Sequence, residues 1–203
     1  MATKNELRQH YLEKRSKIPF GKIDKWSKKI NDRFLSLKDL ETAQKIMSYI
    51  SMRKEVNTYP LLETLIENGF KLYLPYTLKQ EGTLGTAQIN NLDLDLQAGV
   101  FGVQEPKREL RNKKVPDDLD IIIVPGAVFN KAGYRIGYGG GYYDKFLAEH
   151  GQSALKVAFA YEEFIIDDFP VEDHDIAVDM IITQNDIITI ENWGVLIEFI
   201  WKP

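Results

Sequence analysis

The sequence predicts an α/β fold: a single three-layer domain over residues 1–203, with a mostly parallel central sheet flanked by helices. Short apolar runs alternate with amphipathic segments of helix length, which is typical of parallel strands joined by helical crossovers. A glycine-rich loop follows the apolar run at 121–124, and sheets of this kind bind ligands in loops beyond the carboxyl ends of their strands. A chain of 203 residues fits one domain, and we find no internal repeat and no evident linker.

Four segments are expected to form helices: residues 4–17, 21–36, 59–67 and 143–149. In the second segment Ile23, Trp26 and Ile30 recur every three or four positions, which places them on one face of a helix. The first two helices are separated by a turn at Pro19–Gly21. Gly69 is expected to end the third helix.

The expected strands are the apolar runs at 45–50, 71–74, 120–124, 155–160 and 180–183, with a last candidate at 194–201. We expect Pro75 to stop the second strand, because proline has no backbone N–H to donate to a ladder. Residues 79–112 are polar, and we expect them to be irregular with short strand-like pieces.

The composition excludes several classes of function. The net charge of −4 indicates no nucleic-acid-binding surface, so an anionic ligand would need a local basic pocket. The chain has no cysteine, which excludes disulfides, thiolate nucleophiles and cysteine-based zinc sites. The first residues are polar and no apolar run approaches the roughly 18 residues of a membrane helix. We therefore expect a cytoplasmic protein without a signal peptide or membrane contact, and we favour a monomer.

The most informative segment follows the strand at 121–124. The chain turns at Pro125-Gly126 and then carries glycines at 133, 137, 139, 140 and 141, immediately before an expected helix. Glycines let backbone N–H groups approach an anion, and the start of a helix adds partial positive charge. The segment therefore predicts a phosphate cradle.

This cradle differs from the common ones. It is not a P-loop, because no Lys-Ser or Lys-Thr follows the glycines, and it is not the dinucleotide fingerprint, because the third glycine comes one position early at Gly141. A tight turn that only packs a helix against the sheet is the alternative interpretation. The flanking residues favour a ligand, since a packing turn has no need of Arg135, Tyr142, Tyr143 and Asp144 together.

Charged residues around this motif have two interpretations each. Arg135, on the rim of the cradle, suits bidentate phosphate contact or a surface ion pair. Lys4 and Arg8 share one face of the first helix, which by itself is usually a solvated face. Asp144 suits either a helix cap or a Mg²⁺ ligand. Asp175 stands in an acidic stretch that, alone, is usually a solvated loop.

These residues resemble the signature of the 5-formyltetrahydrofolate cyclo-ligase family, also called methenyltetrahydrofolate synthetases. The glycine-rich part of the resemblance rests on Pro125-Gly126, Phe129, Gly133, Arg135-Ile136-Gly137 and the run from Gly139 to Asp144. The resemblance continues, in the expected order and over nearly the whole chain, at Lys4, Arg8, Tyr49–Ser51, Glu55–Thr58, Gly102–Pro106, His174-Asp175 and Val178-Asp179.

The resemblance implies an ATP- and Mg²⁺-dependent conversion of 5-formyltetrahydrofolate to 5,10-methenyltetrahydrofolate, with release of ADP and phosphate. The formyl oxygen would be phosphorylated, and N10 of the folate would then attack the activated carbon. The implied ATP contacts are Lys4, Arg8, Arg135, Gly137, Gly139, Gly140, Gly141, Tyr142 and Tyr143. The implied folate contacts are Ile50, Glu55, Tyr138 and Tyr142. Arg135 and Tyr143 would serve catalysis, and Asp144 and Asp175 would hold Mg²⁺, with Asp175 preferred to Asp179 because it follows His174.

Two other readings remain open. A sugar-phosphate isomerase or CoA-transferase-like enzyme would use a general-base carboxylate and need no ATP. A nucleotide- or folate-binding module would keep the cradle without turnover. The acidic pair and the order of motifs favour the cyclo-ligase, although Tyr138 and Gly140 stand where some family members carry basic residues. The three histidines show no metal-ligand spacing, so no zinc site is expected.

Overall fold

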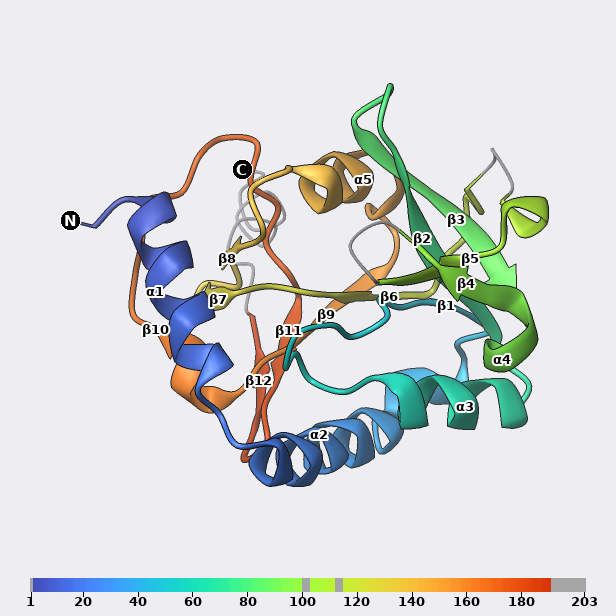
Figure 1. The fold of residues 1–203 in the computed structure, drawn as a ribbon, viewed down its shortest axis with the longest axis horizontal. Helices are drawn as coiled ribbons and strands as arrows, with labels where there is room; N and C mark the ends of the chain where they lie inside the picture. The colour runs from blue at the N-terminus through green and yellow to red at the C-terminus, as the bar shows by residue number, and fades with distance from the viewer. Residues whose placement is uncertain (1, 100–102, 112–114, 191–203) are drawn as a thin grey trace, which may run out of the picture.

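The computed structural model describes residues 2–99, 103–111 and 115–190. The strands of the main sheet are β1 (Lys45–Met47), β2 (Lys71–Leu78), β3 (Thr83–Ile89), β6 (Ile121–Val124), β9 (Leu155–Phe159), β11 (Met180–Ile182) and β12 (Ile187–Thr189). In the described part of the chain they form a seven-stranded sheet in the order β12-β11-β9-β6-β1-β2-β3 (Figure 1). The neighbours from β11 to β2 are parallel, and β3 and β12 add antiparallel edges. The predicted α/β class with a mostly parallel sheet is confirmed.

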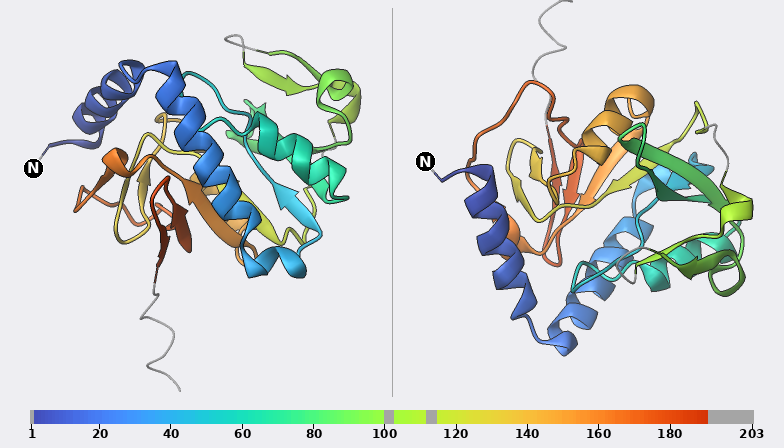
Figure 2. Two further views of the ribbon diagram at one scale, coloured as in Figure 1. Left: turned by 90° about the horizontal axis from the view of Figure 1, so that it is seen from below. Right: turned by 45° about the horizontal axis from the view of Figure 1, so that its top comes forward.

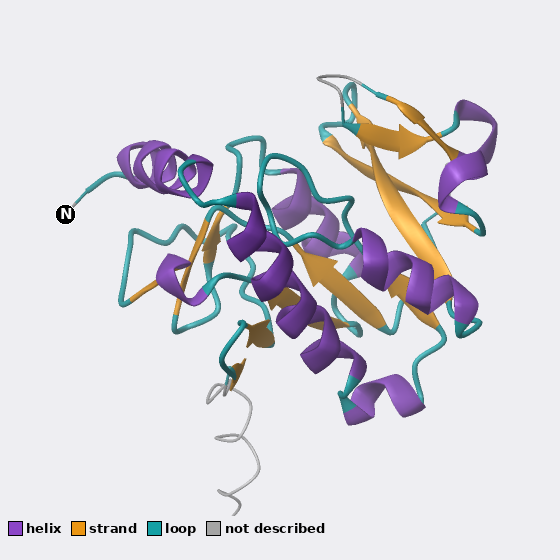
Figure 3. Cartoon of the chain, turned by 60° about the horizontal axis from the view of Figure 1, so that its bottom comes forward, coloured by secondary structure: helices purple, strands orange, loops and turns teal. Residues whose placement is uncertain are grey.

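Helices cover both faces of this sheet. The helices are α1 (Lys4–Ser16), α2 (Phe20–Leu35), α3 (Tyr59–Glu67), α4 (Leu92–Asp95) and α5 (Tyr142–His150), with 3-10 turns at Lys38–Glu41, Arg108–Leu110 and Glu162–Phe164. α2 and α3 lie on one face, in front in Figure 3, and α5 lies on the other. The four helices expected from the sequence begin and end within one residue of these bounds.

The core follows from the alternation of side chains along the strands. In β6, Ile121 and Ile123 join the core beneath α2 and α3, whereas Ile122 and Val124 join the core beneath α5. All four side chains are buried. A strand buried on both faces reads as a continuous apolar run, which is why this one is evident in the sequence.

A second, three-stranded sheet positions the glycine-rich loop. Its strands are β7 (Val128–Asn130), β8 (Arg135–Ile136) and β10 (Ile165–Ile166), in the order β10-β7-β8. Leu7 and Tyr11 of α1 pack against the core of this sheet, and Figure 2 shows α1 beside it in both views. The sequence predicts a loop here, because strands of two or three residues are too short for a periodic pattern.

Two expectations are wrong: that Pro75 stops the second strand, and that residues 79–112 are irregular with only short strand-like pieces. β2 continues through Pro75 to Leu78 and pairs with β3, a seven-residue strand in the segment expected to be irregular. The C=O of Tyr73 accepts a hydrogen bond from Ser48, so Pro75, two residues further, also faces the β1 side, where β1 has already ended. The missing N–H of Pro75 therefore costs no ladder bond. A further two-stranded sheet joins β4 (Leu96–Ala98) to β5 (Gln104–Pro106).

The last candidate strand, 194–201, lies outside the described residues. The single-domain assignment for 1–203 stays a prediction. Among the residues that the structure describes, no helix is both long enough and apolar enough to cross a membrane.

Candidate active site

Two large cavities meet beyond the carboxyl end of β6. The glycine-side cavity, of about 420 Å³, is lined by the glycine-rich loop, Lys4, Arg8, Arg135, Asp144 and Asp175. The hairpin-side cavity, of about 740 Å³, is lined by Ile50, Glu55, the β2–β3 hairpin and Glu105. Their common wall consists of Leu84, Pro125, Tyr138, Tyr142 and Tyr143. Most of the predicted site residues thus line these two cavities, on either side of their common wall.

The glycine-rich loop leads directly into the start of α5. Gly141 is the N-cap of α5, has a φ of 65° and caps the helix with no side-chain hydrogen bond. A side chain at Gly140 would collide with the ring of Tyr142, since an added Cβ would lie 2.6 Å from it. The first-turn N–H groups of α5 are therefore left without a side-chain cap beside the glycine-side cavity, an arrangement suited to an anion.

Arg135 lies beneath the cradle. It is 6% exposed, donates from Nη1 to the C=O of Ile176 at 2.7 Å, and donates from Nη2 to Oδ1 of Asp144 at 2.9 Å. Burial lowers the pKa of Arg135 from its ordinary value, although the Asp144 charge opposes that shift. The expected place on the rim is wrong, and so is the alternative of a surface ion pair, because β8 directs this side chain inward. The guanidinium still lines the glycine-side cavity.

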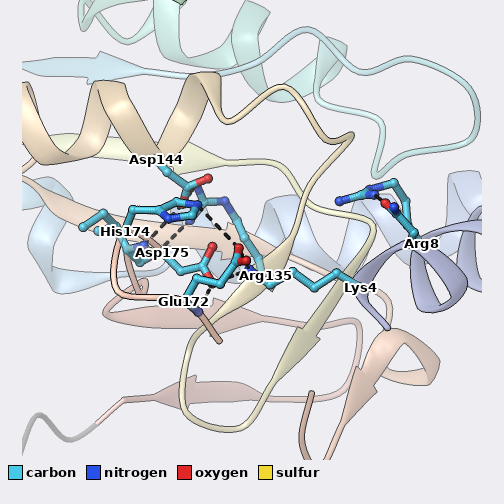
Figure 4. Close-up of polar contacts among 9 residues, drawn as sticks. Lys4, Arg8, Arg135, Asp144, Glu172, His174 and Asp175 are labelled. Atoms are coloured by element: carbon cyan, nitrogen blue, oxygen red, sulfur yellow. Dashed lines mark hydrogen bonds and ion pairs between the residues drawn. The ribbon is translucent and has the colours of Figure 1, made fainter. Parts of the chain in front are cut away.

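The two predicted metal ligands line the same cavity. Figure 4 shows their side chains among the polar contacts of the site. Asp144 accepts from Arg135 and from the backbone N–H of Ile176, both on Oδ1. Asp175 accepts from Lys4 and from the backbone N–H of Glu172, both on Oδ2. The second oxygen of each carboxylate accepts no hydrogen bond from the described residues, and carboxylate oxygens are ligands that Mg²⁺ prefers. The donor set therefore fits the ion, whereas the helix-cap interpretation of Asp144 finds no support in its hydrogen bonds.

The N-terminal helix is tied to this cavity by its basic residues. Lys4 forms ion pairs with Asp175 at 2.5 Å and Glu172 at 2.8 Å. Arg8 donates from Nε to the C=O of Gly137 at 2.7 Å and lies apart from the acidic group in Figure 4. Burial alone would lower the pKa of Lys4, but its hydrogen bonds to Asp175 and Glu172 prevail and raise it. Lys4 thus remains a cation where the sequence expected a phosphate contact.

Replacing Lys4 by Met is expected to strengthen Mg²⁺ binding to the ATP-free protein severalfold, because the ammonium now neutralises Asp175. Because the resemblance implies an ATP contact at Lys4, the same change is expected to raise the KM for ATP about tenfold through the loss of a cation beside the phosphates. Mg²⁺ titration by calorimetry and steady-state kinetics would measure the two effects. Lys17→Met, at the C-cap of the same helix, removes an exposed ion pair with Glu13 and is the matched control. Unchanged Mg²⁺ and ATP constants in Lys4→Met would contradict this role.

Glu55 is the buried carboxylate of the hairpin-side cavity. Its Oε1 accepts from the hydroxyl of Tyr138 at 2.5 Å and its Oε2 from the backbone N–H of Met52 at 2.8 Å. The preceding turn holds Arg53 and Lys54 at φ values of 45° and 62°, which are unusual for residues other than glycine. Burial raises the pKa of Glu55, while the Arg15 charge and the Tyr138 hydroxyl lower it. A strained turn therefore holds a carboxylate whose charged form is disfavoured by burial. Functional sites often contain carboxylates with pKa values shifted in this way.

Arg15 also belongs to the site, although no sequence motif indicates it. It is 4% exposed, donates to the hydroxyl of Tyr138 and to the C=O of Gly126, and lies 4.0 Å from Oε1 of Glu55. A signal was present, because Lys4, Arg8 and Arg15 are spaced by four and seven residues and so share one helical face. Glu172 was missed as well, although it belongs to the acidic stretch that holds Asp175.

The tyrosines of the common wall have different surroundings. The hydroxyl of Tyr143 is buried and has no hydrogen-bond partner among the described residues. Burial raises the pKa of Tyr143 far above its ordinary value, so its hydroxyl stays protonated. A buried hydroxyl without a partner on the wall between two cavities is placed to donate to a ligand.

The remaining candidates are divided between site and scaffold. Ile50 is buried against the hairpin-side cavity, as expected for an apolar contact. Asp179, which was not preferred, pairs with Lys156 at 2.7 Å and accepts from its backbone N–H, which joins β9 to the segment before β11. His174 lies with Glu172 and Asp175, their candidate ligand atoms within 4.8 Å of one another.

The fold and the site define an α/β enzyme with an anion cradle at the carboxyl end of a central strand and a second, larger cavity beside it. The chain belongs to the 5-formyltetrahydrofolate cyclo-ligase family, whose sequence model matches residues 1–184. A probable 5-formyltetrahydrofolate cyclo-ligase from Caenorhabditis elegans is 25% identical over 194 residues, covering 91% of this chain and 94% of the relative. The 5-formyltetrahydrofolate cyclo-ligase of Saccharomyces cerevisiae is 28% identical over 204 residues, covering 90% and 95%.

A solved structure agrees with this membership, and a second one shares the fold. The NMR structure of Aquifex aeolicus 5,10-methenyltetrahydrofolate synthetase superimposes with a TM-score of 0.81 at 29% identity, covering 93% of each chain. A 5,10-methenyltetrahydrofolate synthetase from Mycoplasma pneumoniae has a TM-score of 0.72 at 24% identity, covering 90% of this chain and 99% of that one. The second likeness supports the fold alone.

Proposed function

We propose that this enzyme converts 5-formyltetrahydrofolate to 5,10-methenyltetrahydrofolate, using ATP with Mg²⁺ and releasing ADP and phosphate. The observation that carries the proposal is the pair of cavities that share the wall of Tyr138, Tyr142 and Tyr143. One cavity has the cations and uncapped helix start that an anion requires, and the other has a buried carboxylate among apolar side chains. Methenyltetrahydrofolate synthetase activity requires binding sites for ATP and for a folate side by side. The family membership supports this activity.

ATP is assigned to the glycine-side cavity. Lys4, Arg8 and Arg135 supply positive charge there, and four glycines supply backbone surface without side chains: Gly137, Gly139, Gly140 and Gly141. The folate is assigned to the hairpin-side cavity, where Glu55 would accept N–H groups from the amino-pyrimidine edge of the pterin and Ile50 would contact the ring. Tyr142 lines both cavities and is assigned a contact to both ligands.

The chemistry must make the oxygen of an N-formyl group into a leaving group. In the first step the formyl oxygen bonds to the γ-phosphorus of ATP while the bond from that phosphorus to the β-phosphate oxygen breaks, releasing ADP. N10 of the same folate then attacks the formyl carbon, the carbon–oxygen bond breaks, and phosphate departs with the proton that N10 loses as the ring closes. Such a transfer depends on alignment and charge neutralisation, so no covalent intermediate on the protein is required.

Two side chains are assigned direct roles in that transfer. Arg135, buried with its charge beside the cavity, would stabilise charge on the transferring phosphoryl group. The hydroxyl of Tyr143 would donate a hydrogen bond to a ligand oxygen that lies at the boundary between the two cavities. Mg²⁺, held by Asp144 and Asp175, would supply further neutralisation of the phosphate charge.

Asp144→Asn is expected to raise the Mg²⁺ concentration required for half-maximal rate about tenfold, because an amide oxygen is a weaker ligand than a carboxylate. A magnesium titration of the initial rate would measure it. Asp32→Asn, which removes an exposed ion pair with Lys28, serves as the control. A titration curve of Asp144→Asn that overlays the wild type would remove Asp144 from the metal site.

The reaction itself is tested by absorbance at the methenyl-folate band, after mixing the protein with 5-formyltetrahydrofolate and Mg²⁺, with and without ATP. Growth of the band only with ATP supports the proposal. Binding of both ligands without growth of the band would favour the non-catalytic binding module. Absence of folate binding would favour the alternative hypothesis of a sugar-phosphate isomerase or CoA-transferase-like enzyme.

Location and assembly stay predictions. A cytoplasmic monomer without nucleic-acid partners is still our expectation, and one plant relative, from Arabidopsis thaliana, is described as mitochondrial.

A further inference from the structure

Arg15 lies close to both large cavities but lines neither of them. The space that it does line, together with Glu55 and Gly126, has a volume of about 20 Å³. Such a space holds a water molecule but no substrate. Any effect of Arg15 on ligands must therefore pass through the side chains that it contacts.

Those contacts have a defined direction. A guanidinium only donates hydrogen bonds, so the bond from Nη2 of Arg15 uses a lone pair of the Tyr138 oxygen. The hydroxyl proton of Tyr138 is thereby directed to Oε1 of Glu55, at 2.5 Å. The Arg15 guanidinium also lies 5.6 Å from the centre of the Tyr138 ring. Arg15 thus orients the hydroxyl and the ring of Tyr138, and through them one oxygen of Glu55.

The charge of Arg15 acts on the same carboxylate. Glu55 is 6% exposed, and a buried carboxylate loses its charge unless a cation or hydrogen-bond donors favour it. Arg15, at 4.0 Å, is the ion-pair partner of Glu55 among the described residues. Three segments far apart in sequence, α1, the turn before α3 and the glycine-rich loop, therefore meet at one buried charge pair.

We propose that Arg15 is a positioning residue for the folate: it holds Tyr138 and the Glu55 carboxylate in the arrangement that receives the pterin ring. This inference rests on the proposed function, because it assigns the hairpin-side cavity to the folate. Arg15 itself touches no substrate. Its loss releases Tyr138 and Glu55, and of the two large cavities Glu55 lines the hairpin-side one alone, so folate affinity is expected to fall. ATP affinity is expected to stay nearly unaltered, because Lys4, Arg8 and Arg135 keep their contacts.

The pH dependence of folate binding provides a second readout. The groups that face Glu55 are Arg15 of α1, Arg53 of the preceding turn, Tyr49 after β1, Tyr138 of the glycine-rich loop, Tyr143 of α5 and Tyr161 after β9. Burial raises the pKa of each of these tyrosines, so they stay neutral between about pH 5 and 8. Glu55 is then the group of this set that titrates. Removing Arg15 makes ionisation of Glu55 harder, so folate affinity should begin to fall at a higher pH as the solution is acidified.

The test compares Arg15→Met with the wild type by calorimetry from pH 5.5 to 8.5, using 5-formyltetrahydrofolate and, separately, a non-hydrolysable ATP analogue. At neutral pH the folate Kd is expected to rise about tenfold or more, and the acid limb to move up by about one pH unit. The Kd of the ATP analogue is expected to stay within about twofold of the wild type, which also verifies that the variant is folded. Lys14→Met, which removes the neighbouring charge bonded to the C=O of Glu163, is the matched control.

An Arg15→Met variant that binds the folate like the wild type, or that loses both ligands equally, overturns the inference. Should this variant not fold, Arg15→Lys and Tyr138→Phe decide: folate weakening in both, with ATP-analogue binding retained, supports the role, and wild-type folate affinity in both removes it. Arg15→Lys keeps the charge, so its acid limb should stay near that of the wild type. Failure of the wild type itself to bind the folate would instead remove the proposed function, and this inference with it.

Discussion

Arg135→Ala is expected to lower kcat by about two to three orders of magnitude, the usual cost of removing one donor that stabilises transition-state charge. The guanidinium is a buried cation beneath the glycine-rich loop, held in one direction by Asp144 and the C=O of Ile176, so the alanine variant loses both the charge and its placement. Steady-state kinetics with both ligands saturating would measure the loss.

The same substitution should also weaken the fold, because Asp144 loses its partner and the C=O of Ile176 loses its donor. A loss of about 2 kcal/mol in the free energy of unfolding is expected, so rates must be expressed per folded molecule. Arg33→Ala is the matched control: Arg33 donates to the C=O groups of Gln184 and Asn185 and lines neither large cavity. It should lower stability while the folded molecules keep their kcat. A folded Arg135→Ala protein with near-normal kcat would remove Arg135 from the mechanism.

Glu55→Gln is expected to weaken folate binding about a hundredfold or more, because the amide presents donors where the pterin edge needs acceptors. The change preserves shape, so any loss reflects the hydrogen-bonding pattern. ATP-analogue binding should remain unchanged, since Glu55 lines the hairpin-side cavity and not the glycine-side cavity.

Calorimetric titration of each ligand separates these effects. Glu63→Gln, an exposed position on α3, controls for the loss of one negative charge. Equal affinity of the wild type and Glu55→Gln for 5-formyltetrahydrofolate would show that the pterin lies elsewhere. A parallel loss of both ligands would indicate a structural effect of the Met52–Glu55 turn instead.

Much of the fold could be predicted because its signals are local. The β6 strand is buried on both faces and therefore appears as four consecutive apolar residues, and α2 shows its buried face through helical spacing. The sequence does not predict the strand β3, because Thr83, Gly85 and Gln88 interrupt its alternation of apolar and polar residues. The predicted end of β2 at Pro75 is too early, because a proline is tolerated there once the neighbouring strand β1 has ended.

The candidate site was predicted less evenly. The glycines and Asp144 stand together in one motif, so their proximity needs no tertiary information. The interior position of Arg135 could not be predicted, because the two-residue strand β8 gives no pattern from which its direction can be read. Arg15 was missed because the residues that explain it, Tyr138 and Glu55, are remote in sequence.

The sequence by itself determined which segments form helices and central strands and where the chain lacks side chains around a helix start, because spacing and glycine content act over a few residues. Only the tertiary structure decided which charges meet: Lys4 with Asp175, Arg135 with Asp144, and Arg15 with Glu55 through Tyr138. Such pairs depend on the distance between atoms, and that distance is set by how α1, the glycine-rich loop and the segment before α3 pack at the carboxyl end of the sheet.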